Sequence, residues 1–166
     1  CHEFGAPLQI ETIDLREPVT GEVEITLGAV AVCHSDISFA DGDWGGELPA
    51  VYGHEAAGFI SKTGNAVKGF EIGDRVVVTL IKSCGNCNNC LEGNPTICEA
   101  NKNTIPPILS SKGNTIQQVM NCGAFAEKVV VDQSQIVKLD SDLNFTTASL
   151  LACGVITGIG AVVNAA

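Results

Sequence analysis

CGNCNNCLEGNPTIC, residues 84–98, places four cysteines within fifteen residues and fills most of the gaps with glycine, asparagine and proline. The loop contains too few apolar residues to fold by burying a core of its own. Its spacing, Cys84-x2-Cys87-x2-Cys90-x7-Cys98, puts successive sulfurs on one side of a tight turn. Four thiolates that converge in this way suit a tetrahedral Zn²⁺ with Zn–S distances of about 2.3 Å. The spacing therefore favours a structural zinc site, closed by four cysteines and without an open position for chemistry.

Two other ways of holding the loop remain open at this point. An iron–sulfur cluster uses a similar run of cysteines, although the short ferredoxin spacing that ends in Cys-Pro is absent. Disulfides among the eight cysteines are geometrically possible. They are disfavoured because no signal-peptide pattern opens the chain and 166 residues are enough to build a core.

Composition and charge exclude several classes of protein. With 45% hydrophobic and 17% charged residues the chain is globular, and its length fits one ordinary domain. Nineteen acidic against nine basic residues give a net charge of −10, which argues against nucleic acid or an anionic membrane surface as a partner. The longest apolar run, residues 148–163, contains three glycines and is shorter than the roughly 20 residues of a membrane span.

The ends of the sequence indicate an excised piece of a longer protein. The chain begins at Cys1 without an initiator methionine and stops at Ala166 inside a segment with helical composition. The signals that usually end a helix, glycine, a basic last turn or a following proline, are missing there.

Short strands account for most of the chain. Strand-like alternation or β-branched composition, bounded by turns, occurs in residues 21–28, 56–62, 76–79, 125–131 and 135–139. Such spacing is typical of a barrel or sandwich. From Thr146 onwards small and apolar residues favour helix, and residues 100–121 have weak periodicity and predict a long surface excursion. The fold class is therefore mainly β with short helices.

Three further stretches carry residues whose side chains could bind a metal or take part in catalysis: Cys33-His34-Ser35-Asp36, Gly53-His54-Glu55 and Cys153. Taken singly each has an ordinary structural interpretation, because free cysteine is among the most buried residue types. A lone histidine beside glycine is likewise more often structural than a ligand. Residue types and spacing alone do not predict a second metal site here.

In combination, however, these stretches resemble a known family. Cys33-x20-His54-Glu55, followed by the four-cysteine loop, a distant Cys153 and the turn Gly73-Asp74-Arg75-Val76, is similar to the zinc-dependent alcohol dehydrogenases of the medium-chain dehydrogenase/reductase superfamily. The resemblance covers essentially the whole chain. It implies that residues 1–166 are a GroES-like catalytic domain, a partly open β-barrel, with an inserted structural-zinc lobe at about residues 82–100.

The resemblance also implies two zinc ions per chain. Cys33, His54 and Cys153 match the ligands of the catalytic zinc, and Cys84, Cys87, Cys90 and Cys98 match those of the structural zinc. Two thiolates and one imidazole leave a fourth position for water or a substrate oxygen. Glu55 matches a carboxylate that approaches the metal during ligand exchange.

The resemblance also covers four other positions near the catalytic zinc. Asp36 matches the acid that accepts the second ring N–H of His54, although an acid there also suits a helix cap. Ser35 matches the hydroxyl that takes the substrate proton. His34 matches a basic residue that meets the cofactor pyrophosphate, or is simply a surface histidine. Ser38 departs from the family pattern, since many members have a histidine there, and the proton path then runs through the cofactor ribose and water.

Trp44 and Leu80 match positions of the substrate pocket, although Trp44 also suits an aromatic that packs a glycine-rich loop. Gly158-Ile-Gly160 begins like a dinucleotide fingerprint, but Val163 stands in place of the third glycine and no strand precedes it. We therefore expect no Rossmann cofactor domain within these residues, and no activity from them alone.

The function implied by the resemblance is oxidation of an alcohol to an aldehyde or ketone with NAD or NADP, the zinc acting as a Lewis acid. It further implies a small-molecule alcohol or aldehyde substrate, a cytoplasmic location, and a homo-oligomer at full length. Two alternatives stay open: a superfamily relative that acts on a polyol or a thiol–formaldehyde adduct, and a non-catalytic, zinc-stabilised GroES-like module.

Overall fold

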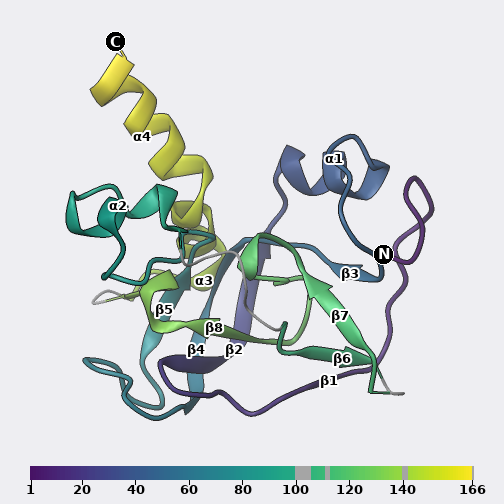
Figure 1. Cartoon of the computed structure of the whole chain (residues 1–166), viewed down its shortest axis with the longest axis horizontal. Coiled ribbons are helices and arrows are strands. Elements are labelled where there is room, and N and C mark those ends of the chain that lie inside the picture. Colours follow the sequence, from purple (N-terminus) through teal and green to yellow (C-terminus); the bar gives the residue numbers. More distant parts are fainter. Residues whose placement is uncertain (100–105, 111–112, 140–141, 166) are drawn as a thin grey trace.

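A computed structural model describes residues 1–99, 106–110, 113–139 and 142–165, and within them the chain forms two β-sheets with short helices at their edges (Figure 1). The larger sheet has the strand order β8-β2-β4-β5-β9 and the smaller one β1-β6-β7-β3. The strands are β1 (Ile13–Leu15), β2 (Glu22–Ala31), β3 (Ala50–Val51), β4 (Glu55–Thr63), β5 (Arg75–Val78), β6 (Ile108–Ser110), β7 (Thr115–Gln118), β8 (Lys128–Asp132) and β9 (Ile136–Lys138).

The described helices are all short except the last. They are α1 (His34–Asp41), α2 (Asn88–Leu91), α3 (Phe145–Ser149) and α4 (Gly154–Ala165), with 3₁₀ turns at Pro95–Ile97, Val119–Asn121, Gln133–Gln135 and Leu150–Ala152. The two sheets do not close into one barrel. The prediction of a mainly β, partly open fold with short helices is confirmed.

The antiparallel pair β2 and β4 lies at the centre of the larger sheet and carries most of the core. β2 pairs with β4 on one side and with β8 on the other. The main apolar cluster is formed by side chains from these strands, from β5 and β9, and from the segment before β8; its fully buried members include Val23, Ile25, Ala56, Ile60, Val76, Val78 and Val129. Burial of β-branched side chains on a pleated surface is what stabilises such a sheet.

The sequence of β2 predicts buried apolar residues alternating with exposed polar ones. This prediction is wrong at Glu24, which is only 4% exposed. Its carboxylate accepts a hydrogen bond from Ser61 at 2.8 Å and ion-pairs with Lys62 and Lys128, each at 3.2 Å. A buried carboxylate is tolerated when it is paired and hydrogen-bonded in this way.

Strand boundaries shift from the expected ones by one to three residues. β5 begins and ends one residue earlier than expected, and β8 begins at Lys128, three residues later. β9 is shorter than expected because Asp132 and Gln135 cap a 3₁₀ turn between β8 and β9. The helix expected from Thr146 exists but is broken near Cys153.

The surface excursion expected over residues 100–121 is wrong in its described part. β6 and β7 pair antiparallel, and Ile108 and Ile116 face each other in this pairing, 1% and 5% exposed. Two short strands with one buried residue each give almost no periodicity, which explains why the sequence pattern missed them. Residues 100–105 and 111–112 lie outside the described residues.

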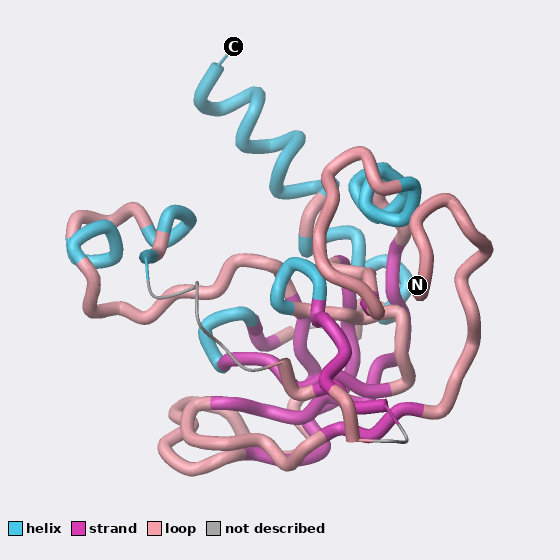
Figure 2. The backbone as a smooth tube through the Cα atoms, turned by 45° about the vertical axis from the view of Figure 1, so that its right-hand side comes forward, coloured by secondary structure: helices cyan, strands magenta, loops and turns pink. Residues whose placement is uncertain are grey.

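Two segments extend away from the sheets, namely α4 and the described part of the cysteine lobe, residues 82–99 with α2 (Figures 1 and 2). Within the described residues no single helix is long and apolar enough to cross a bilayer; only the pair Phe145–Ala152 and Gly154–Ala165, bent by 45°, reaches the required length and composition together.

Gly58 in β4 lies directly against the backbone of β2, and we expect Gly58→Ala to destabilise the domain. A Cβ at this position would lie 2.2 Å from the Thr26 carbonyl oxygen and 2.9 Å from the Leu27 Cα. Backbone in the centre of a sheet cannot move away cheaply, so the free energy of unfolding should fall by about 1–3 kcal/mol. Urea denaturation measures this change.

Gly158→Ala is the matched control for this substitution. Gly158 lies in α4, where an added methyl meets no atom within 4 Å other than the backbone of its own helix turn, so alanine should leave stability unchanged or raise it by about 0.5–1 kcal/mol. Equal stability of the Gly58→Ala variant and the wild type would show that β2 and β4 are not packed as closely as described.

Candidate active site

Helix α1 presents the first group of candidate residues at its N-terminus, directly after β2. Cys33 is the N-cap residue, with φ −102° and ψ 156°, and Asp36 is the third residue of the helix. The Asp36 Oδ2 atom accepts the Cys33 backbone N–H at 3.0 Å. This is the reciprocal half of a capping box, and it fixes where Cys33 and Ser35 lie relative to the helix.

The other oxygen of Asp36 reaches the loop before β4. Its Oδ1 atom accepts the Gly53 N–H at 3.0 Å and lies 3.2 Å from Nδ1 of His54. Asp36 is therefore both the helix cap and the hydrogen-bond partner of His54, so the two interpretations of this residue are realised together. Gly53 has φ +92°, and a Cβ there would lie 2.7 Å from the Phe125 backbone nitrogen, so only glycine fits.

The pairing of Asp36 with His54 also sets their charges. Burial alone would raise the pKa of Asp36, but hydrogen bonds from His54, Cys33 and Gly53 outweigh it and lower that pKa. Burial alone would lower the pKa of His54, but the hydrogen bond and the charge of Asp36 outweigh it and raise that pKa. The Asp36 carboxylate can only accept from Nδ1, so neutral His54 carries its proton on Nδ1 and presents Nε2 as an acceptor.

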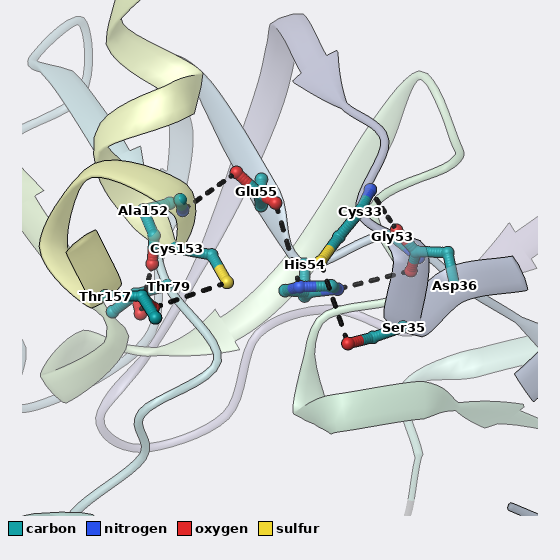
Figure 3. Close-up of polar contacts among 11 residues, drawn as sticks. Cys33, Ser35, Asp36, Gly53, His54, Glu55, Thr79, Ala152, Cys153 and Thr157 are labelled. Carbon is teal, nitrogen blue, oxygen red and sulfur yellow. Dashed lines mark hydrogen bonds and ion pairs between the residues drawn. The ribbon is translucent and has the colours of Figure 1, made fainter. Parts of the chain in front are cut away.

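The His54 side chain is only 1% exposed, yet its Nε2 atom has no hydrogen-bond partner among the described residues. It faces Cys33, Glu55 and Cys153, and the four candidate ligand atoms of this group lie within 4.8 Å of one another (Figure 3). The nearest Glu55 oxygen is 3.9 Å away. A buried polar atom without a partner is costly and calls for an explanation.

The two cysteines of this group differ in their surroundings. The Ser35 backbone N–H lowers the pKa of Cys33, whose sulfur also lies 3.6 Å from the Ser35 hydroxyl. Burial and the nearby Glu55 charge raise the pKa of Cys153. Two thiols, a carboxylate and an imidazole lone pair form a set of electron donors, and among the described residues no lysine or arginine is paired with them. Such a set suits a bound cation.

The geometry of the group fits zinc in particular. Ligands at 2.0–2.3 Å from a tetrahedral metal lie roughly 3.3–3.8 Å apart, so a group within 4.8 Å needs only a small contraction. Cysteine sulfur and histidine nitrogen are the ligands zinc prefers, and the second nitrogen of a zinc-bound histidine usually donates to a carboxylate, as Nδ1 does here.

The four cysteines of the lobe form a second group, separate from the first: the sulfurs of Cys84, Cys87, Cys90 and Cys98 also lie within 4.8 Å of one another. The sulfurs of Cys87 and Cys98 are 3.9 Å apart, close to the edge of a zinc–thiolate tetrahedron. Backbone N–H groups point at the sulfurs, for example from Cys84 to Cys98 and from Cys87 to Cys84, both at 3.3 Å. Such donors stabilise thiolates and orient them as ligands.

The thiols of the lobe differ in pKa. Backbone N–H groups of Glu99 and Cys90 lower the pKa of Cys87 to about 6, whereas burial raises that of Cys90 to about 11. Four adjacent thiolates would repel one another, so all four can be deprotonated together only around a cation.

The remaining predicted residues lie outside the two groups of candidate metal ligands. His34 is exposed at the first position of α1, and Ser38 is buried on the same helix. Trp44 is 57% exposed and packs edge-on against Phe39, with 5.0 Å between ring centroids. Leu80 is partly buried and packs against the main core cluster.

Two threonines beside Cys153 were not among the predicted residues. The Thr79 hydroxyl donates to the Ala152 carbonyl at 3.1 Å, and the Thr157 hydroxyl lies 4.0 Å from the Cys153 sulfur. Thr157 follows Cys153 by four positions, a helical spacing that sequence reasoning could have used. Nothing in the sequence signals Thr79, because its partner is 73 positions away.

The fold is mainly β, with two sheets that do not close into one barrel, and it carries two cysteine-containing groups. These features together define a class of protein, the GroES-like catalytic domain of zinc-type alcohol dehydrogenases. The family model described as alcohol dehydrogenase GroES-like domain matches residues 19–141, and the chain belongs to this family. The resemblance drawn from the sequence is thereby confirmed.

Individual relatives agree with this assignment. An S-(hydroxymethyl)glutathione dehydrogenase of Synechocystis is 36% identical over 99% of this chain and 47% of its own length. A crystal structure of an alcohol dehydrogenase zinc-binding domain protein from Burkholderia ambifaria has a TM-score of 0.90 and 29% identity, over 98% of this chain and 46% of that one. Benzyl alcohol dehydrogenase from Acinetobacter calcoaceticus has a TM-score of 0.82 and 30% identity, over 95% and 44%. The chain thus spans about half the length of these relatives.

Proposed function

We propose that the chain is the catalytic domain of a zinc-dependent alcohol dehydrogenase, which oxidises an alcohol to an aldehyde or ketone with NAD or NADP. The observation that carries this proposal is the buried Nε2 atom of His54, which has no hydrogen-bond partner among the described residues and faces Cys33, Glu55 and Cys153. Membership of the alcohol dehydrogenase GroES-like domain family supports it.

Cys33, His54 and Cys153 are the proposed ligands of the catalytic zinc. A zinc ion bound there would supply Lewis acidity toward a substrate oxygen. Three protein ligands leave a fourth position open, as catalytic zinc sites require. Asp36 keeps His54 in the tautomer whose Nε2 is free to bind the metal. A Glu55 oxygen lies within 4.8 Å of the three proposed ligand atoms, and Glu55 also accepts the Gly154 N–H at 3.4 Å.

Ser35 is the proposed acceptor of the substrate proton. Its hydroxyl lies 3.6 Å from the sulfur of Cys33, one of the proposed ligands. A serine hydroxyl can accept one proton while donating its own to a neighbour. Since Ser38 has no basic side chain, it would not relay this proton as a histidine could, and His34 is the residue that would meet the pyrophosphate of a bound cofactor.

The names of the relatives favour two substrate classes. One solved relative is a benzyl alcohol dehydrogenase, and one curated relative is an S-(hydroxymethyl)glutathione dehydrogenase. A primary alcohol and a thiol–formaldehyde adduct share a reacting hydroxymethyl group and differ in what surrounds it. Trp44 and Leu80 are the proposed pocket residues that would distinguish the two.

Cobalt substitution tests whether Cys33, His54 and Cys153 share one metal. Cobalt bound by thiolates gives charge-transfer bands in the near ultraviolet, and a tetrahedral field gives visible bands. We expect two cobalt ions per chain, and we expect His54→Ala and Cys153→Ala to abolish the same one of the two spectra. The spectrum of the cysteine lobe should remain in both variants.

His2→Ala and Cys1→Ser are the matched controls, since these residues belong to neither metal-binding group. Both should retain two cobalt ions. If His54→Ala and Cys153→Ala removed different signals, or none, the catalytic interpretation would fail. A non-catalytic module stabilised by the lobe metal alone would then account for the chain.

A further inference from the structure

The helical segment that carries Cys153 is broken at this residue. Phe145–Ala152 and Gly154–Ala165 are bent by 45° relative to each other, and Cys153 itself has φ −142° and ψ −67°, outside the helical region. The first backbone bond of α4 runs from the Thr157 N–H to the Cys153 carbonyl at 2.9 Å. The Ala152 carbonyl therefore lies before the hydrogen-bonded part of α4, and it needs another partner.

The peptide groups on either side of Cys153 are held by two side chains, one from β4 and one from the residue that directly follows β5 (Figure 3). On one side the Thr79 hydroxyl donates to the Ala152 carbonyl at 3.1 Å. On the other side the Gly154 N–H donates to Glu55 at 3.4 Å. Between these two contacts the Cys153 side chain is turned toward His54.

Thr79 is itself fixed by the buried core. Its N–H donates to the Gln135 carbonyl at 2.8 Å. Its carbonyl accepts from the Gln135 side chain at 3.1 Å and from the Cys122 thiol at 3.3 Å. Gln135 and Cys122 are 1% and 0% exposed. With its backbone held in this way and a β-branched side chain that is stiff at χ1, Thr79 offers its hydroxyl in one direction.

We propose that Thr79 is a positioning residue for Cys153. Its hydroxyl holds the Ala152 carbonyl, and thereby the bend that turns the Cys153 thiol toward His54. The inference rests on the proposed function, because it concerns Cys153 as a ligand of the catalytic zinc. Hydrogen bonds behind a metal ligand commonly affect metal affinity about 10–100-fold.

Three variants of the 166-residue chain, each loaded with cobalt, test the proposal. Thr79→Val removes the hydroxyl and keeps the shape of the side chain, Thr79→Ser keeps the hydroxyl, and Thr26→Val makes the same change at an exposed position of β2. We expect Thr79→Val to shift the thiolate bands of the Cys33, His54 and Cys153 site and to weaken its cobalt affinity about 10–100-fold. Thr79→Ser and Thr26→Val should match the wild type, and the lobe spectrum should be constant throughout.

The outcomes separate this proposal from a merely structural role. If Thr79→Val only lowered the melting temperature and left the spectrum and affinity of the site unchanged, the positioning role would be overturned. Failure of Thr79→Ser to restore the site would also overturn it. If Thr79→Val did not fold, Thr79→Ala would take its place with the same criteria. Absence of a second cobalt ion from the wild type would instead refute the proposed function, and this inference with it.

Discussion

Cys98→Ser is expected to release the metal of the cysteine lobe and to lower the melting temperature of the domain, while the other metal stays bound. Cys98 is 8% exposed and its sulfur accepts the Cys84 N–H, so serine would replace a buried ligand with a weaker one. The lobe has little apolar packing of its own, since Leu91 and Ile97 are 73% and 61% exposed. Structural zinc contributes about 10–16 kcal/mol of apparent binding free energy in zinc-finger peptides.

Metal content by mass spectrometry and thermal unfolding measure this effect together. Cys122→Ser is the informative control, because Cys122 is fully buried but belongs to neither metal-binding group. It should lower the melting temperature without changing the number of bound metal ions. Retention of two metal ions by Cys98→Ser would contradict the assignment of the lobe.

Ser35→Ala is expected to lower kcat about 10²–10⁴-fold in a protein that joins this domain to a cofactor-binding domain, the range typical of a lost general acid–base group. This corresponds to roughly 3–5 kcal/mol in the activation free energy. Both metals should remain bound, because Ser35 is not among the candidate ligands. The hydroxyl lies 3.6 Å from the Cys33 sulfur and would otherwise receive the substrate proton.

Steady-state kinetics with parallel metal analysis check this expectation. Ser35→Thr keeps a hydroxyl at the same position and should retain most of the activity. A loss of metal in Ser35→Ala would mean that Ser35 supports Cys33 rather than the proton path. Full activity in Ser35→Ala would remove Ser35 from the proposed mechanism.

The sequence by itself was sufficient for features that depend on local spacing. The four cysteines of the lobe lie within fifteen residues, so the chain between them limits how far apart their sulfurs can be. Strand-forming segments such as β2 and β4 were recognisable because β-branched and alternating residues favour a pleated, half-buried surface. The family could also be recognised, since its motif combines several of these local patterns.

Only the tertiary structure decided features that depend on distant segments. Cys33, His54 and Cys153 are 21 and 99 positions apart, and spacing alone did not predict that they meet. The burial of Glu24 depends on Ser61, Lys62 and Lys128 from neighbouring strands. The hydrogen bond from Thr79 to Ala152 depends on the packing of the broken helix against β5. Local propensity determines which segments become strands or tight loops, whereas a site built from separate segments exists only after the core has packed them together.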